Sequence, residues 1–178
     1  MKKKQEDLRG VDEEHAAAWM VRGEQGVKRR LAELIYEATK DIFAICGYPP
    51  KYLLSAKTAL KAVAKRGVSV RPVCMIRPMQ SIDEALVGDA TVIEYRSVKA
   101  FSTLKVRIQP HDEKLLGGFR GMPGEGAMVI IDESMAFDIV DDGSDPKKAA
   151  GILIKAPGIP PIQKATVERI LALYTRKL

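Results

Sequence analysis

The chain has 178 residues, a length that suits one domain and allows a substantial buried core. Hydrophobic residues make up 46% and charged residues 29%, and no apolar run reaches the ~20 residues of a membrane span. The net charge is +6, but the basic residues are spread along the chain among acidic ones, and only 6% of residues are aromatic, which argues against a base-stacking platform.

The first 14 residues carry many charges and one leucine. No apolar stretch follows the initial lysines, so the pattern is not that of a secretory signal peptide, and a cytoplasmic location is expected. We predict that residues 1–14 form a mobile arm or the end of a preceding helix. Residues 15–178 are predicted to form one domain.

The next segment alternates strands and helices. An apolar run over 16–22, closed by Gly23, predicts the first strand. A helix follows, because apolar residues recur at steps of three, four and one, namely Val27, Leu31, Leu34, Ile35, Ala38 and Ile42. A strand over about 42–46, a helix over about 50–66 that Gly67 ends and a strand over 68–76 favour a right-handed parallel βαβ unit.

Shorter elements are predicted in the second half. Ser81 to Glu84 reads SIDE, a capping-box pattern that predicts a short helix ended by Gly88. Strands are predicted over 91–96, 104–109, 127–132, 135–140 and 151–155. The runs 127–132 and 135–140 are separated by two residues only, which predicts a hairpin.

Residues 111–126 are rich in glycine and predict a loop. Pro160 and Pro161 open a last helix with an apolar stripe at helical spacing, formed by Val167, Ile170, Leu171, Tyr174 and Leu178. The predicted fold class is therefore α/β, with a mixed, largely parallel sheet flanked by helices.

The cysteines and histidines do not form a metal motif. Cys46 and Cys74 end two apolar runs without CxxC spacing, and His15 and His111 are isolated from them. We predict buried free thiols, which neighbouring parallel strands could bring close together, and neither a metal nor a cofactor.

The order of features from Trp19 to Gly67 is more specific than any one of them. The chain contains a tryptophan strand (WMVRG), an amphipathic helix with LIYEA, an alternating strand IFAIC and the junction AKRGVSVR. In this order they resemble the central domain of TrmB-type transcriptional regulators. The later segments VRIQP and MVIIDESMAFDIV are similar to the closing strands of that family, so that the resemblance covers about residues 15–178.

The resemblance implies a phospholipase D-like α/β domain that senses an effector and forms homodimers. Members of the family place a winged-helix DNA reader before this domain, and some add a sugar-binding domain after it. Residues 1–14 do not have the pattern of a winged helix. DNA binding is therefore expected only through a domain outside this sequence, and no residue of this chain is predicted to contact DNA.

Phospholipase D-type catalysis is not expected. Its His-x-Lys-x4-Asp motif would end at Asp132, which places Glu125 at the histidine position and Ala127 at the lysine position. Glutamate repels an incoming phosphodiester and alanine supplies no cation. Ile139 and Val140 stand where the family's enzymes have glycine and serine. We predict no catalytic residue, and a hairpin turn explains Asp132 equally well.

A ligand cleft is nevertheless expected beyond the carboxyl ends of the parallel strands. Tyr48 offers a ring and a hydroxyl there, and Arg77 offers a guanidinium fork for a carboxylate, phosphate or sugar hydroxyl. Glu125 completes the candidate set if the strand order follows the family. The alternatives are that Tyr48 packs on the prolines that follow it and that Arg77 and Glu125 are solvated. Trp19 is predicted to belong to the core.

The function predicted is thus effector sensing and dimerisation, with a small polar or anionic effector, a sugar among the candidates. One alternative is a diverged phosphodiesterase or nuclease, for which His111 is the candidate histidine. A second alternative is a small nucleic-acid-binding module with basic residues clustered on one surface. For the dimer, Leu173 lies outside the apolar stripe of the last helix and marks a candidate contact.

Overall fold

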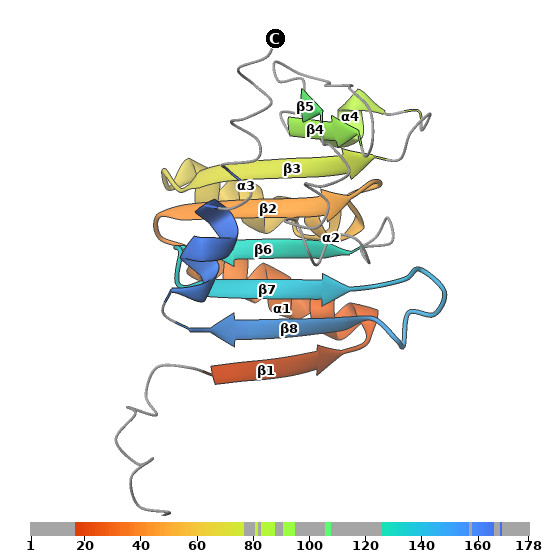
Figure 1. Ribbon diagram of the computed structural model, residues 1–178, viewed down its shortest axis with the longest axis horizontal. Coiled ribbons are helices and arrows are strands. Elements are labelled where there is room, and N and C mark those ends of the chain that lie inside the picture. Colours follow the sequence, from red (N-terminus) through yellow and green to blue (C-terminus); the bar gives the residue numbers. More distant parts are fainter. Residues whose placement is uncertain are drawn as a thin grey trace, which may run out of the picture.

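The computed structural model describes residues 17–76, 81, 83–87, 91–94, 106–107, 126–156, 158–165 and 168. They form one mixed sheet with helices on both faces (Figure 1). The predicted arm 1–14, the predicted loop 111–126 except its last residue, and the apolar stripe of the last helix lie outside the described residues.

The first six elements follow the predicted order. They are β1 (Ala17–Arg22), α1 (Glu24–Glu37), β2 (Asp41–Gly47), α2 (Lys51–Ser55), α3 (Lys57–Lys65) and β3 (Ser69–Ile76). The predicted helix over 50–66 is divided into α2 and α3 at Ala56, whose backbone is not helical (φ −95°, ψ 9°). Gly67 ends the helical segment with φ 88°, a conformation that glycine adopts without a steric cost.

The remaining elements are shorter. They are α4 (Glu84–Val87), β4 (Thr91–Glu94), β5 (Val106–Arg107), β6 (Ala127–Ile131), β7 (Met135–Val140), β8 (Ala150–Lys155) and a helical segment over 159–165. The predicted hairpin is confirmed as the antiparallel pair β6–β7. The capping box is wrong in one detail: Asp83, and not Ser81, precedes α4 and accepts the Ala85 N–H through Oδ1 at 2.9 Å.

The sheet order is β1-β8-β7-β6-β2-β3-β4-β5. The prediction of a largely parallel sheet is wrong, because four neighbouring pairs are antiparallel and three are parallel. Only β2 to β5 form a parallel half. The strands β6, β7 and β8 follow one another through short connections that contain no helix, so each reverses direction.

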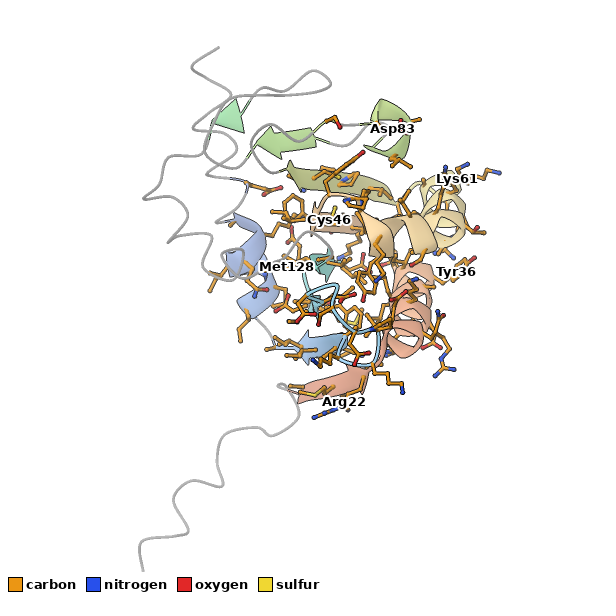
Figure 2. The ribbon with its side chains drawn as sticks, turned by 90° about the vertical axis from the view of Figure 1, so that its right-hand side faces the viewer. Arg22, Tyr36, Cys46, Lys61, Asp83 and Met128 are labelled. Atoms are coloured by element: carbon orange, nitrogen blue, oxygen red, sulfur yellow. The ribbon has the colours of Figure 1, made fainter. Side chains whose placement is uncertain are left out.

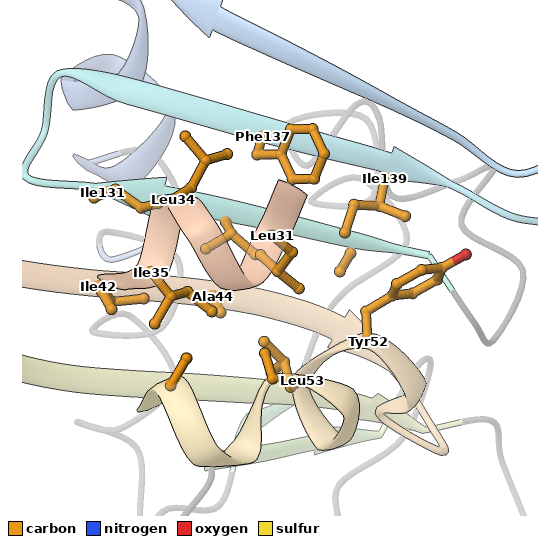
Figure 3. Close-up of a cluster of buried hydrophobic side chains, with 14 of the residues drawn as sticks. Leu31, Leu34, Ile35, Ile42, Ala44, Tyr52, Leu53, Ile131, Phe137 and Ile139 are labelled. Carbon is orange, nitrogen blue, oxygen red and sulfur yellow. The ribbon is translucent and has the colours of Figure 1, made fainter. Parts of the chain in front are cut away.

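The main core lies between the sheet and the helices α1, α2 and α3. α1 buries Leu31, Leu34 and Ile35 completely, and the charged residues of this helix face away from the sheet. Figure 3 shows these side chains among the sheet residues that complete the cluster, which include Ile42, Ala44, Ile131, Phe137 and Ile139.

Trp19 is not part of this core. The prediction that it is buried is wrong, because 48% of its surface is exposed. The reason is the strand order: among the described strands β1 pairs with β8 alone and is the outermost strand of the sheet, and its burial pattern is mostly exposed.

The opposite face of the sheet carries the helical segment over 159–165 (Figures 1 and 2). Lys164 of this segment is buried and donates hydrogen bonds to the Asp41 carboxylate and, at 2.5 Å, to the Glu133 carboxylate. Burial acts to lower the pKa of Lys164, but the two carboxylates outweigh it and the pKa is raised. The segment is therefore held to the sheet by a charged contact.

Candidate functional site

The residues predicted from the sequence to contact a ligand lie at, or next in the chain to, one edge of the sheet. β2 and β3 end there, β6 begins there and β7 ends there, and we call it the carboxyl edge. The Gly47 N–H donates to the Gly126 carbonyl oxygen at 3.1 Å, which joins the end of β2 to the start of β6. Tyr48 follows Gly47 at this edge. Arg77 and Glu125 lie outside the described residues, although each adjoins a described residue of the same edge.

The Tyr48 side chain has a structural role in addition to any ligand contact. It is half-buried, packs against the main core and accepts a hydrogen bond from the Asp83 N–H at its hydroxyl oxygen, at 2.8 Å. This bond connects the turn after β2 with the start of α4, two segments 35 residues apart. Tyr48 therefore fixes the relative positions of two loops at the carboxyl edge.

A buried carboxylate at the same edge was not found from the sequence. Asp141 is 2% exposed and accepts hydrogen bonds from the Tyr52 hydroxyl at 2.6 Å and the Gly143 N–H at 2.9 Å. The Lys51 amine lies 3.2 Å from Asp141 and 2.7 Å from Glu24 at the start of α1. The network joins α1, α2 and the end of β7.

The charges in this network are matched. Burial acts to raise the pKa of Asp141, but the hydrogen bonds from Tyr52, Gly143 and Lys51 outweigh it and lower the pKa. Burial, followed by the hydrogen bond to Asp141, raises the pKa of Tyr52. Asp141 thus remains ionised and already has three donors, which describes a stabilising contact better than a free acid–base group.

The two cysteines lie side by side near the carboxyl edge. Cys46 of β2 and Cys74 of β3 are in direct register, both are buried, and their sulfur atoms are 3.5 Å apart. They are free thiols, so the prediction of buried thiols brought close by parallel strands is confirmed. The neighbouring Cys74 and burial together raise the pKa of the Cys46 thiol well above its ordinary value.

Asp132 is the one acidic residue that fits the phospholipase D-type motif. It lies at the other end of the strands from the carboxyl edge, in the turn between β6 and β7, with φ 52°. Its carboxylate accepts hydrogen bonds from the backbone N–H groups of Thr39 at 2.9 Å, Lys40 at 2.7 Å and Asp41 at 3.0 Å. These bonds attach the hairpin to the loop between α1 and β2. The expectation that a hairpin turn explains Asp132 is confirmed.

Two further searches concern only the described part of the chain. No group of three or more His, Cys, Asp or Glu residues within it is arranged to hold a metal ion. Each helix within it is too short or too polar to cross a bilayer.

Residues 17–107, about half of the chain, match the family model described as "Transcriptional regulator TrmB, EBD N-terminal subdomain", the first part of an effector-binding domain. A search of curated proteins found no matching sequence.

Solved structures with a similar fold share little sequence. One is TrmBL2, an archaeal chromatin protein whose structure is described as showing a novel mode of DNA binding, with 13% identity and a TM-score of 0.50. The alignment covers 98% of this chain and 57% of TrmBL2, so the chain spans little more than half of that protein.

A second structure is NucT from Helicobacter pylori, with 11% identity, a TM-score of 0.57 and coverage of 90% of this chain and 98% of NucT. Phosphatidylserine synthase of Haemophilus influenzae Rd KW20 aligns at 12% identity over 88% of this chain and 38% of its own, with a TM-score of 0.44 that is too low to support an argument. At such identities the likeness concerns the fold alone.

Proposed function

Because this chain belongs to the TrmB family of transcriptional regulators, through the N-terminal subdomain of their effector-binding domain, we propose that it senses an effector and dimerises without catalysing a reaction. The family match carries this proposal, since it spans β1 to β5 and therefore includes the β2–β3 half of the carboxyl edge. The fold is proposed to be phospholipase D-like. A cytoplasmic location follows from a regulator's need to reach DNA.

The effector is proposed to be a small polar or anionic molecule, sugars included, that binds at the carboxyl edge. Tyr48, Arg77 and Glu125 are the proposed contacts. Ligands of open α/β sheets bind where parallel strands end, and β2 and β3 are such a pair. No residue of this chain is proposed to read DNA, and that contact is assigned to a separate reader domain of the regulator.

The absence of catalysis is proposed from the motif positions. Ala127 is fully buried and offers no charge to a phosphate, and the Asp132 carboxylate is occupied by backbone amides at the opposite edge. Purified protein should therefore not hydrolyse bis-p-nitrophenyl phosphate or single-stranded DNA. Turnover that disappears in His111→Ala would contradict the proposal and favour a diverged phosphodiesterase.

Effector binding can be tested by thermal shift with a panel of sugars, sugar phosphates, organic acids and inorganic phosphate. A ligand at 100 times its Kd should stabilise the domain by about 2.7 kcal/mol, which raises Tm by roughly 5–10 °C in a chain of this size. The shift should shrink in Arg77→Ala. It should persist in Lys61→Ala, which removes an exposed charge from the outer side of α3 (Figure 2). Equal shifts in the wild type and in Arg77→Ala would place the effector elsewhere.

A further inference from the structure

A surface pocket of about 250 Å³ lies on the two outermost strands at one side of the sheet, β1 and β8, and its lining includes none of the residues proposed for the carboxyl edge. It is lined by Trp19, Val21, Arg30, Leu153 and Lys155. Trp19 is paired with Leu153 in register, and Leu153 is buried, so that it forms the apolar floor. Arg30 reaches the pocket from α1. Three separate elements therefore contribute to one small concave surface.

The exposed indole of Trp19 is the first feature that indicates a ligand. A tryptophan usually buries most of its large apolar ring, but 48% of Trp19 is exposed and its ring lines the pocket. The Lys155 amine lies 5.8 Å from the centre of the ring, close enough for a cation–π contact. The pocket thus has a flat apolar surface next to a positive charge.

The charges at the pocket are the second feature. Arg30 has a carboxylate partner, Glu33, at 2.9 Å, and a more distant one, Glu37, at 4.0 Å. Lys155 takes part in no ion pair among the described residues. The Lys155 cation near the ring therefore has no carboxylate partner within the described part of the chain, and an anionic group of a ligand could form an ion pair with it.

We propose that this pocket binds a small anion that carries a ring, such as a sugar phosphate or an aromatic carboxylate. The face of the ring stacks on Trp19, and the carboxylate or phosphate contacts Lys155, with Arg30 as a second donor. The volume lies just below the roughly 300–1,000 Å³ of sites for drug-sized ligands, so a monosaccharide or a single aromatic ring is the expected size. This site is independent of the effector site proposed at the carboxyl edge.

Trp19 is the only tryptophan of the chain, so intrinsic tryptophan fluorescence reports on this pocket alone. We would titrate the protein with glucose 6-phosphate and with phenylacetate, each of which carries a ring and an anion. Glucose and inorganic phosphate, the two halves of glucose 6-phosphate, would be titrated separately for comparison. A saturable change is expected with at least one of the first two, at a concentration at least about tenfold lower than with either half alone.

Lys155→Met is the decisive variant, because it keeps the apolar stem of an exposed side chain and removes the charge. It should weaken binding by about tenfold or more. Lys147→Met is the matched control, because it lowers the net charge of +6 by the same amount but removes an exposed charge away from the pocket. It should bind the probes as the wild type does.

Three results would overturn the proposal. One is the absence of a saturable change up to about 10 mM of every probe. Another is wild-type affinity in Lys155→Met. The third is a Trp19 emission that changes on dilution without any ligand, since this would show that a second copy of the chain covers the pocket.

Discussion

The Asp132 carboxylate makes an unusually dense set of contacts for a turn residue, with three backbone N–H groups and the Thr39 hydroxyl as donors. Asp132→Ala should lower the free energy of unfolding at pH 7 by about 2–3 kcal/mol, because hydrogen bonds to a charged acceptor are lost and the amides lose their partner. Urea unfolding measures the change. Glu37→Ala, an exposed residue on α1, is the control and should change the stability by less than about 0.5 kcal/mol.

The same carboxylate gives the prediction a pH dependence. Burial acts to raise the pKa of Asp132, but the amides of Lys40, Thr39 and Asp41 outweigh it and lower the pKa below 3.8. A lowered pKa contributes stability that is present above pH 3.8 and is lost as the pH falls through the folded-state pKa. The difference between wild type and Asp132→Ala should therefore shrink at acid pH, and a constant difference would contradict this assignment.

Asp138 of β7 should behave in the opposite way. Its Oδ1 atom is buried without a hydrogen-bond partner, and burial raises the pKa of this carboxyl above 3.8. A raised pKa contributes stability that is present below pH 3.8 and is lost as the pH rises through the folded-state pKa, so the charged form is unfavourable at pH 7. Asp138→Asn should then stabilise the domain by on the order of 1 kcal/mol at pH 7 and by nothing at pH 3. A destabilised variant at pH 7 would mean that Asp138 has a favourable partner.

Among the elements, the β2–β3 pair gives the sharpest chemical prediction. Cys46 and Cys74 are the only cysteines of the chain, and each is at most 2% exposed. A thiol reagent such as DTNB reacts with an accessible thiolate, so both thiols should react slowly in the native protein and at once in urea. Fast native reaction of either thiol would contradict the burial. Adding urea after the native reaction counts the two thiols and serves as the control.

The elements themselves were largely predictable from the sequence, because their signals are local. A short apolar run closed by Gly23 located β1, helical periodicity located α1, and the short separation of two apolar runs located the β6–β7 hairpin. The division of one predicted helix at Ala56 was missed, since alanine favours a helix and gives no local signal to stop. Strand direction was overestimated as parallel, because the βαβ pattern of β2 and β3 was extended to strands that no helix connects.

At the scale of the whole molecule, the features that were missed depend on contacts between distant residues. Tyr52 and Asp141 are 89 residues apart, so no motif reveals their hydrogen bond. The exposure of Trp19 depends on the position of β1 at the sheet edge, and that position follows from pairing with β8, more than 100 residues later. The carboxyl edge was predictable, since it requires only that β2 and β3 be parallel neighbours.

The last prediction is the homodimer proposed for this regulator domain. Light scattering at about 50 μM, above typical dimer dissociation constants, should give a mass of twice 19.6 kDa. Two surfaces compete for the contact. Leu173 was proposed from the sequence and lies outside the described residues. Met20 is 57% exposed on β1, whose outer backbone groups face no other strand among the residues that the structure describes.

Charged substitutions separate these surfaces. If the last helix forms the contact, Leu173→Glu should lower the mass toward that of one chain and Met20→Lys should not; a contact through β1 gives the reverse. Lys61→Glu, on the exposed side of α3, controls for a change of charge alone. The proposed pairing follows from the way regulators bind two half-sites on DNA. A wild-type mass of 19.6 kDa at this concentration would contradict dimerisation. Effector binding would not be affected by that result, because the thermal-shift experiment tests it separately.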